Sequence, residues 1–314
     1  MSQAYPIELI SIEDKEKLMD KYGRSFLYEV KSDIYGCCIK LLTNIRRVKE
    51  RWEENFYAMS TNIRSHGRLV VVEDENKPTK VYYDPQSKTA FLINFDYYGW
   101  VKSIALSVAG DVLEDEHDIY SIHGACLDYD GRGLCFVGTS GSGKTTQAYG
   151  LLRIEDVRVV SDDWFFVRIF GKDALAYSSE KNFYIRADLA KIWSEFKGLV
   201  EKAEFDKQGR AIVDLRWVVG KGRIIPVTTL KNIFILKRDP LDKNIHRVLD
   251  SEEALNYIES QNYFNPHLLV KNDFKRKLRN SFFYELFKRV NVHLINTIKP
   301  PEETQNLIRK LISL

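Results

Sequence analysis

The sequence predicts an α/β protein in which a mixed sheet surrounds a glycine-rich loop, preceded by a smaller α+β domain. In the middle of the chain, apolar stretches with the character of strands are joined by short turns on either side of the loop 138–145. In the N-terminal third, alternating stretches separated by polar turns lie between two helical stretches. Strands that pair through short turns around such a loop favour a mixed sheet over a purely alternating parallel one.

Length and charge limit the number of domains and the kinds of partner. A chain of 314 residues with 44% hydrophobic residues favours two domains. The sequence changes character near residue 117, which predicts an N-terminal domain over 1–116 and a second domain over 117–314. The 47 basic and 44 acidic residues are spread along the chain and nearly cancel, so no nucleic-acid partner is expected.

The start of the chain and the cysteines carry no targeting or metal signal. No basic stretch followed by an apolar run opens the sequence, and no window approaches about 18 uninterrupted apolar residues. We therefore expect a cytoplasmic protein without a membrane partner. The four cysteines form no C-x-x-C pair and are expected to be small buried strand residues; they are Cys37, Cys38, Cys126 and Cys135.

Local signals predict the elements of the first domain. Ser11 can cap a helix over 12–23, with Glu13 and Asp14 in its first turn and Gly23 closing it. The stretch 100–116 has apolar residues at helical spacing and predicts a second helix. The strands predicted between them are "FLYEV", "YGCCIKLLTN", "RLVVVEDE", "KVYYDP" and "TAFLINF".

The second domain is predicted to open with two strands, 120–130 and 131–139, joined by a turn within "DYDGRG". A helix over Lys144–Leu152 follows the loop. The stretch "VRVVSDDWFFVRIF" predicts a strand, a break at 161–163 and another strand. Further strand is predicted in "RIIPVT" and "LKNIFILKR", and further helices over 251–260, 271–290 and 301–313.

The stretch "FVGTSGSGKTTQ" holds the spacing G-x-x-x-x-G-K-T of a phosphate-binding loop. Its glycines allow successive backbone N–H groups to converge on phosphate oxygens at the start of a helix. Lys144 supplies a positive charge to the terminal phosphates, and the Thr145 hydroxyl is placed to ligate Mg²⁺. The pattern therefore predicts that a nucleoside triphosphate binds, which we expect to be ATP; the residues expected to bind it are Gly138, Ser140, Gly141, Ser142, Gly143, Lys144, Thr145 and Thr146.

Two carboxylates follow the loop at a distance that suits phosphoryl chemistry. Asp162 and Asp163 come 18 and 19 positions after Lys144, between two strongly apolar stretches. One short helix and one return strand fit into that interval and would bring the pair back beside the loop. One carboxylate can then hold Mg²⁺ while the other accepts a proton from an attacking hydroxyl.

Upstream, the pattern H-G-x-x-L-D-x-x-G-x-G begins at His123 and leads through an apolar strand into the loop. Together with the Ser-Asp-Asp that follows, the region from His123 to Val167 resembles the HPr kinase/phosphorylase family. That resemblance implies a nucleotide-binding fold of the phosphoenolpyruvate carboxykinase type, with the loop built into a mixed sheet. It further implies that Asp162 acts on the acceptor hydroxyl, that Asp163 helps to hold the metal, and that His123 tunes or contacts the catalytic acid.

Outside this region the resemblance is looser. The family's glycine-rich signature with a metal-associated glutamate is not clearly present, and "AYSSEKNFYIR" offers Glu180 in its place, with Arg186 expected on the same strand. A basic catalytic loop of the family is matched loosely by "GKGRIIPVTTLKNIFIL", which makes Lys221 and Arg223 candidates to neutralise charge on the transferred group, with Arg216 as a third. Because the matching segment is missing, the family's reverse phosphorylase reaction is not carried over.

The predicted function is an ATP- and Mg²⁺-dependent kinase that acts on a hydroxyl group. The acceptor, a polypeptide side chain or a small metabolite, is left open, as is the role of the N-terminal domain in substrate selection or homo-oligomerisation. A nucleotide-binding switch or ATPase would use the same loop with water alone, and a carboxykinase-like enzyme would share the fold. A scaffold with a vestigial site is disfavoured, because the lysine, threonine and acid pair are all intact.

Overall fold

The computed structural model describes residues 5–205, 209–213 and 216–314. Its contacts divide the chain into two compact units. The first unit consists of Met1–Ser121 together with Ser179–Lys181 and Asn265–Lys277. The second unit consists of Ile122–Ser178, Asn182–Phe264 and Leu278–Leu314.

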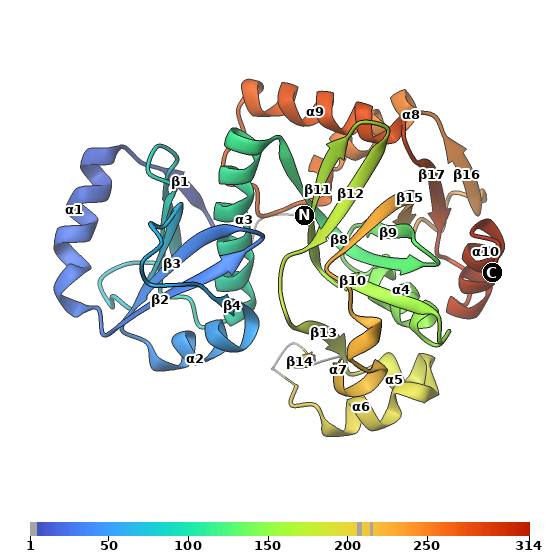
Figure 1. Cartoon of the computed structure of the whole chain (residues 1–314), viewed down its shortest axis with the longest axis horizontal. Helices are drawn as coiled ribbons and strands as arrows, with labels where there is room; N and C mark the ends of the chain where they lie inside the picture. Colours follow the sequence, from blue (N-terminus) through green and yellow to red (C-terminus); the bar gives the residue numbers. More distant parts are fainter. Residues whose placement is uncertain (1–4, 206–208, 214–215) are drawn as a thin grey trace. The chain divides into compact units, whose positions relative to one another are not determined.

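The first unit contains a mixed sheet with the spatial order β1-β6-β7-β5-β3-β2-β4. Four of its strands, β1, β2, β3 and β4, are labelled in Figure 1. Strand β3 pairs antiparallel with β2 and parallel with β5, and β5 pairs parallel with β7. The strands are β1 (Ile7–Leu9), β2 (Tyr28–Ile34), β3 (Cys37–Thr43), β4 (Tyr57–Ala58), β5 (Gly67–Val72), β6 (Lys80–Asp84) and β7 (Thr89–Ile93).

Helix α1 (Ile12–Tyr22) forms where the capping signals predicted it. The Ser11 side chain accepts a hydrogen bond from the Asp14 backbone N–H, and Gly23 is the C-cap. Tyr22 of α1 packs in a cluster with Val70 of β5, on one face of the sheet. Helix α2 (Arg46–Asn55) forms in a basic stretch and buries Val48 and Trp52.

Helix α3 (Tyr98–His117) is the predicted second helix of this part of the chain, extended slightly at both ends. It lies against β3, β5 and β7. Apolar and small residues surround its axis, and almost all of them are buried. Asp118 ends it in a left-handed conformation with φ 53°.

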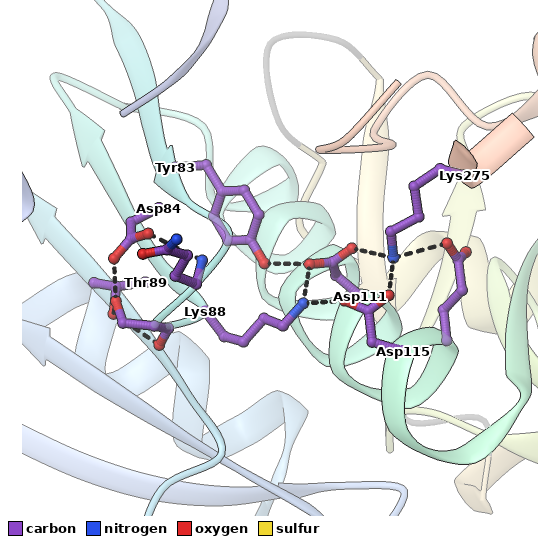
Figure 2. A network of polar contacts seen from close by, with 10 residues as sticks. Tyr83, Asp84, Lys88, Thr89, Asp111, Asp115 and Lys275 are labelled. Carbon is purple, nitrogen blue, oxygen red and sulfur yellow. Dashed lines mark hydrogen bonds and ion pairs between the residues drawn. The ribbon is translucent and has the colours of Figure 1, made fainter. Parts of the chain in front are cut away.

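A buried ionic network ties the segment Asn265–Lys277 to α3. The Nζ of Lys275 lies 2.9 Å from Asp111 Oδ1 and 2.5 Å from Asp115 Oδ1 (Figure 2). It also lies 2.9 Å from Glu114 Oε1. The three carboxylates bring oxygens within 4.8 Å of one another, a grouping that could hold a metal ion. The ammonium group of Lys275 already occupies the position where a cation would neutralise them.

The same network extends into the sheet through Asp111. Its Oδ2 accepts hydrogen bonds from Tyr83 Oη at 2.7 Å and from Lys88 Nζ at 2.6 Å. Burial alone would raise the pKa of Asp111, but the charges of Lys275 and Lys88 outweigh it, and the pKa lies below the ordinary value of 3.8. The carboxylate is therefore held in its charged form.

The second unit contains a sheet with the order β10-β8-β11-β12-β15-β17-β16, in which β9 pairs with both β15 and β8 (Figure 1). A separate antiparallel pair is formed by β13 and β14. The strands are β8 (Ile119–Tyr129), β9 (Arg132–Gly138), β10 (Val157–Ser161), β11 (Trp164–Phe170), β12 (Asp173–Ser178), β13 (Phe183–Arg186), β14 (Arg210–Val213), β15 (Val227–Lys237), β16 (His246–Leu249) and β17 (Asn291–Asn296). Parallel pairs of β15 with β9 and β17 stand beside antiparallel ones, so the expectation of a mixed α/β sheet is confirmed.

The longer helices of the second half of the chain also follow the sequence signals. Helix α4 has the predicted bounds, and α8 is closed at its start by a capping box between Asp250 and Glu253. The prediction of a strand over "RIIP" is wrong, because β15 begins only at Val227. The helices are α4 (Lys144–Leu152), α5 (Leu189–Ile192), α6 (Lys197–Lys202), α7 (Arg216–Val219), α8 (Ser251–Ser260), α9 (Asp273–Phe287) and α10 (Pro301–Leu311).

The cysteines and the apolar character of the helices were also predicted from the sequence. All four cysteines are buried and free, as expected of small core residues. Over the described ranges, no helix combines the length and the apolar character needed to cross a membrane.

The ionic network predicts a large effect of replacing its central lysine. Lys275→Met should lower the free energy of unfolding by about 3–5 kcal/mol, because buried carboxylates lose the charge that balances them. Lys277→Met, at an exposed position on the same helix, should change it by less than about 0.5 kcal/mol. Urea unfolding of both variants at neutral pH measures the difference.

The effect should also depend on pH. The lowered pKa of Asp111 contributes stability that is present above 3.8 and is lost as the pH falls below that value. The deficit of Lys275→Met should therefore shrink in acid, where the carboxylates no longer need a partner. A deficit that is the same at pH 7 and at pH 3 would contradict this account of the network.

Candidate functional site

The glycine-rich loop lies between β9 and α4 and has the backbone that a phosphate cradle requires. Gly138, Gly141 and Gly143 have φ values of 152°, 81° and 98°, which residues with side chains rarely adopt. Gly143 is the N-cap of α4, so the N–H groups of the first helical turn are directed toward the loop. A Cβ atom on Gly138 would lie 2.3 Å from the Leu236 carbonyl oxygen, which leaves glycine as the residue that fits.

Three parallel strands end at the same edge of the sheet as the loop. Gly138 at the end of β9 pairs with Leu236 of β15, and Lys237 at the end of β15 pairs with Asn296 of β17. The Thr297 hydroxyl lies 2.9 Å from the Ser142 carbonyl oxygen and 3.0 Å from the Lys237 carbonyl oxygen. The loop is thus fastened to the carboxyl ends of the strands, the place where open α/β sheets bind ligands.

Lys144 folds back over the loop that carries it. Its Nζ donates to the carbonyl oxygens of Gly138 at 2.8 Å and Thr139 at 3.2 Å. Burial lowers the pKa of Lys144, while the charges of Asp163 and Asp162 act in the opposite direction. Both acids thus act electrostatically on the lysine of the loop.

The remaining loop residues offer oxygen and backbone N–H groups at different depths. Ser140 and Gly141 are exposed, and Thr145 is half-buried in the first turn of α4. Ser142 is 1% exposed, and its Oγ has no hydrogen-bond partner among the described residues. The carbonyl oxygen of Thr146 accepts a 2.8 Å hydrogen bond from Trp193 Nε1, which anchors the first turn of the helix.

Asp162 is the more buried member of the acid pair, at 7% exposure. It stands at the break between β10 and β11, and its Oδ2 accepts a 2.8 Å hydrogen bond from the Tyr184 backbone N–H. Tyr184 belongs to β13, so the small two-stranded sheet holds this carboxylate in place.

Asp163 is held from two sides by β8. Its backbone oxygen accepts a 2.9 Å hydrogen bond from the Gly124 N–H, and its Oδ1 lies 3.2 Å from Nε2 of His123. The other ring nitrogen, Nδ1, lies 2.9 Å from the Phe264 carbonyl oxygen. Because both neighbours of the ring are acceptors, both contacts are hydrogen bonds when the ring carries both protons. His123 thus joins the site through Asp163.

Glu180 is placed differently from the sequence expectation. It precedes β13, which begins at Phe183, so the expectation that it shares a strand with Arg186 is wrong. Glu180 is buried in the first unit, where Lys102 Nζ lies 3.1 Å from its Oε1 and Asn55 Nδ2 donates to its Oε2 at 3.1 Å. These partners give it a structural role, and its role as a metal ligand stays a prediction.

Arg223 binds backbone carbonyl groups of the segment that connects α4 to β10. Its Nη2 donates to the carbonyl oxygens of Leu152 at 2.8 Å, Ile154 at 2.7 Å and Val157 at 2.7 Å. Burial lowers the pKa of its guanidinium group. These contacts are what a structural arginine makes, and its participation in catalysis stays a prediction.

Sequence reasoning did not identify three groups that shape this site. The Tyr184 N–H and the Phe264 carbonyl oxygen are backbone groups, so the residue type at these positions does not predict their role. Thr297 had a usable signal, because it directly follows an apolar strand that ends beside the loop. A hydroxyl residue at the carboxyl end of a strand parallel to β9 is placed where it can contact the loop.

The contact between Gly138 and β15 predicts a difference between two glycines of the loop. Gly138→Ala should lower the free energy of unfolding by more than about 2 kcal/mol, because the new Cβ overlaps the Leu236 carbonyl oxygen. At Gly141 a Cβ would meet nothing within 4 Å, so Gly141→Ala should cost only the left-handed backbone strain of about 1 kcal/mol. Chemical denaturation measures both, and equal losses would argue against the close approach.

Comparison with known proteins leaves the family open. No protein-family model matches the chain, and no curated protein matches it. Among solved structures, it is similar to the Hpr(Ser) kinase/phosphatase from Coxiella burnetii, with 14% sequence identity and a TM-score of 0.36. The similarity covers 61% of this chain and 90% of that one. At this TM-score it is compatible with a distant relationship at most and does not decide the function, which has to be argued from the site.

Proposed function

We propose that the second unit binds ATP with Mg²⁺ and transfers the γ-phosphoryl group to a hydroxyl group of an acceptor. The observation that carries this proposal is the position of Asp162 and Asp163, whose charges act on the lysine of the phosphate-binding loop. A loop alone serves many reactions, whereas a loop with an adjacent acid pair has both a phosphate cradle and a proton acceptor.

The loop supports nucleotide binding through groups that a phosphate can engage. The Nζ of Lys144 is bonded to carbonyl oxygens of its own loop, and a phosphate would offer the ammonium group a full negative charge instead. The N–H groups after Gly143 and the positive end of the α4 dipole favour an anion at the same place. The buried Ser142 Oγ adds a polar atom at the base of the loop.

The oxygen donors near the loop fit Mg²⁺. The Thr145 hydroxyl and the Asp163 carboxylate are hard oxygen ligands of the kind that Mg²⁺ takes in phosphate-transferring sites, where it keeps several waters. When bound, the ion would neutralise charge on the phosphate groups. His123 contacts Asp163 at Oδ1 and so helps to hold the carboxylate that is proposed as a metal ligand.

Asp162 is proposed as the general base. It would accept the proton of the acceptor hydroxyl while that oxygen forms a bond to the γ-phosphorus and the bond to the β–γ bridging oxygen breaks, releasing ADP. The hydrogen bond from the Tyr184 N–H to Oδ2 holds the carboxylate that would take the proton. The acceptor itself, a polypeptide or a metabolite, is identified by its hydroxyl group alone.

Nucleotide binding can be tested without knowing the acceptor. Lys144→Met should weaken binding of Mg²⁺–ATP by about 10- to 100-fold, because a buried charge-assisted contact to phosphate is lost. Lys172→Met, at an exposed turn, should bind like the unchanged protein. Isothermal titration calorimetry of both variants decides, and equal affinities would contradict the role of the loop lysine.

The role of Asp162 can be tested with γ-labelled ATP and candidate acceptors, from small polyols to serine-containing peptides. Asp162→Asn should slow phosphoryl transfer by about 10²- to 10⁴-fold while nucleotide affinity is retained, because only the proton acceptor is removed. Asp130→Asn, in an exposed turn, should transfer at the normal rate.

Full transfer by Asp162→Asn would show that the base is another group. Rapid release of labelled phosphate without any acceptor, unchanged by small molecules or peptides, would instead identify an ATPase or a nucleotide switch.

A further inference from the structure

Three consecutive residues after α8 adopt a left-handed backbone. Asn262, Tyr263 and Phe264 have φ values of 50°, 53° and 54°, and none of them is glycine. A helix end needs one left-handed residue for its cap, so this turn is more than the termination of α8. Left-handed residues with side chains persist where the surrounding structure holds them, and they gather at functional sites.

Side-chain contacts within the second unit hold the turn in this conformation. The Tyr263 hydroxyl lies 2.5 Å from Oδ1 of Asn280, and the Tyr263 ring stacks on that of Phe283 with centroids 5.4 Å apart. Phe264 is buried, and its N–H donates to the Gln261 carbonyl oxygen at 3.0 Å. The last carbonyl group of the turn is therefore fixed in direction.

That carbonyl group meets the ring of His123. The Phe264 oxygen lies 2.9 Å from Nδ1, and because a carbonyl oxygen can only accept, Nδ1 must be the donor. A ring held at Nδ1 presents its opposite nitrogen, Nε2, to Asp163 Oδ1 at 3.2 Å. The contact with the Trp164 ring, with centroids 5.7 Å apart, restricts the same imidazole further.

We propose that the left-handed turn 262–264 and His123 form a positioning relay for the Asp163 carboxylate. The backbone of Asp163 is fixed by the Gly124 N–H, and the relay acts on the rotation of its carboxylate. His123 is then a positioning residue, which acts on the metal through Asp163 without touching substrate. This inference rests on the proposed function, in which Asp163 helps to hold Mg²⁺ beside ATP.

The orientation of the ring can be tested directly, without any activity. In the full chain labelled with ¹⁵N-histidine, the proton on Nδ1 of His123 should give a resonance that exchanges slowly with water. The resonance is assigned by its loss in His123→Gln. Its absence from the unchanged protein would overturn the proposal, whether or not the protein binds ATP.

Two substitutions of His123 separate its two hydrogen bonds. An asparagine amide can replace Nδ1–H toward Phe264, and a glutamine amide can replace Nε2 toward Asp163. Because the relay needs both bonds, His123→Asn and His123→Gln should each weaken Mg²⁺ binding by about 10-fold in the presence of a non-hydrolysable ATP analogue, the size of effect that residues behind a metal ligand have. If His123→Gln kept full Mg²⁺ affinity, the Phe264 carbonyl group would be dispensable and the relay disproved.

The turn itself is tested by a matched pair at Asn262. Glycine tolerates φ near +50°, whereas a β-branched valine opposes it, and both substitutions remove the same amide. Asn262→Gly should keep the Nδ1 proton resonance, and Asn262→Val should lose it together with about 10-fold in Mg²⁺ affinity. Identical spectra and affinities would overturn the role of the turn. If the unchanged protein showed the Nδ1 resonance but bound no Mg²⁺–ATP, the proposed function would fail while the ring orientation stood.

Discussion

The parallel pairing of β15 with both β9 and β17 is the constraint on which the candidate site depends. It places the last residues of three strands at one edge of the sheet, and the missing side chain at Gly138 lets the loop leave that edge against the Leu236 carbonyl group. The Thr297 hydroxyl then ties the loop to the neighbouring strand ends. These contacts matter because a phosphate-binding loop works only if its position relative to the catalytic groups is fixed.

The charges of the loop lysine and of the acid pair are the second feature that shapes the site. A partly buried lysine charge is costly, and in this structure the charge of Lys144 is balanced in part by carbonyl oxygens of the loop and in part by Asp162 and Asp163. The two acids are adjacent in sequence but are supported by different elements, one by the N–H of Tyr184 in β13 and the other by His123 in β8. Separate supports allow adjacent carboxylates to take separate tasks.

The sequence was informative wherever short-range signals decide structure. Ser11 and Gly23 defined α1, the glycine pattern placed the loop before α4, and the polar break between two apolar stretches located the acid pair. Predictions from the sequence were wrong or missing where contacts between distant residues determine the structure. Glu180 is paired by residues from α2 and α3, and no spacing in the sequence reveals that. The left-handed turn at 262–264 contains no glycine, so its conformation is imposed by packing that periodicity cannot foresee.

The ionic network around Lys275 has a consequence for how the protein is made. Its acidic members lie on α3, whereas the lysine comes 160 residues after Asp115 along the chain. During synthesis the carboxylates of α3 therefore emerge with Lys88 as a partner of Asp111 and Asp115, and most of the second unit has to be translated before the charge of Lys275 is added. The first unit therefore includes a segment, Asn265–Lys277, that is made long after the rest of it, so its last ion pairs form only when nearly the whole chain has been synthesised.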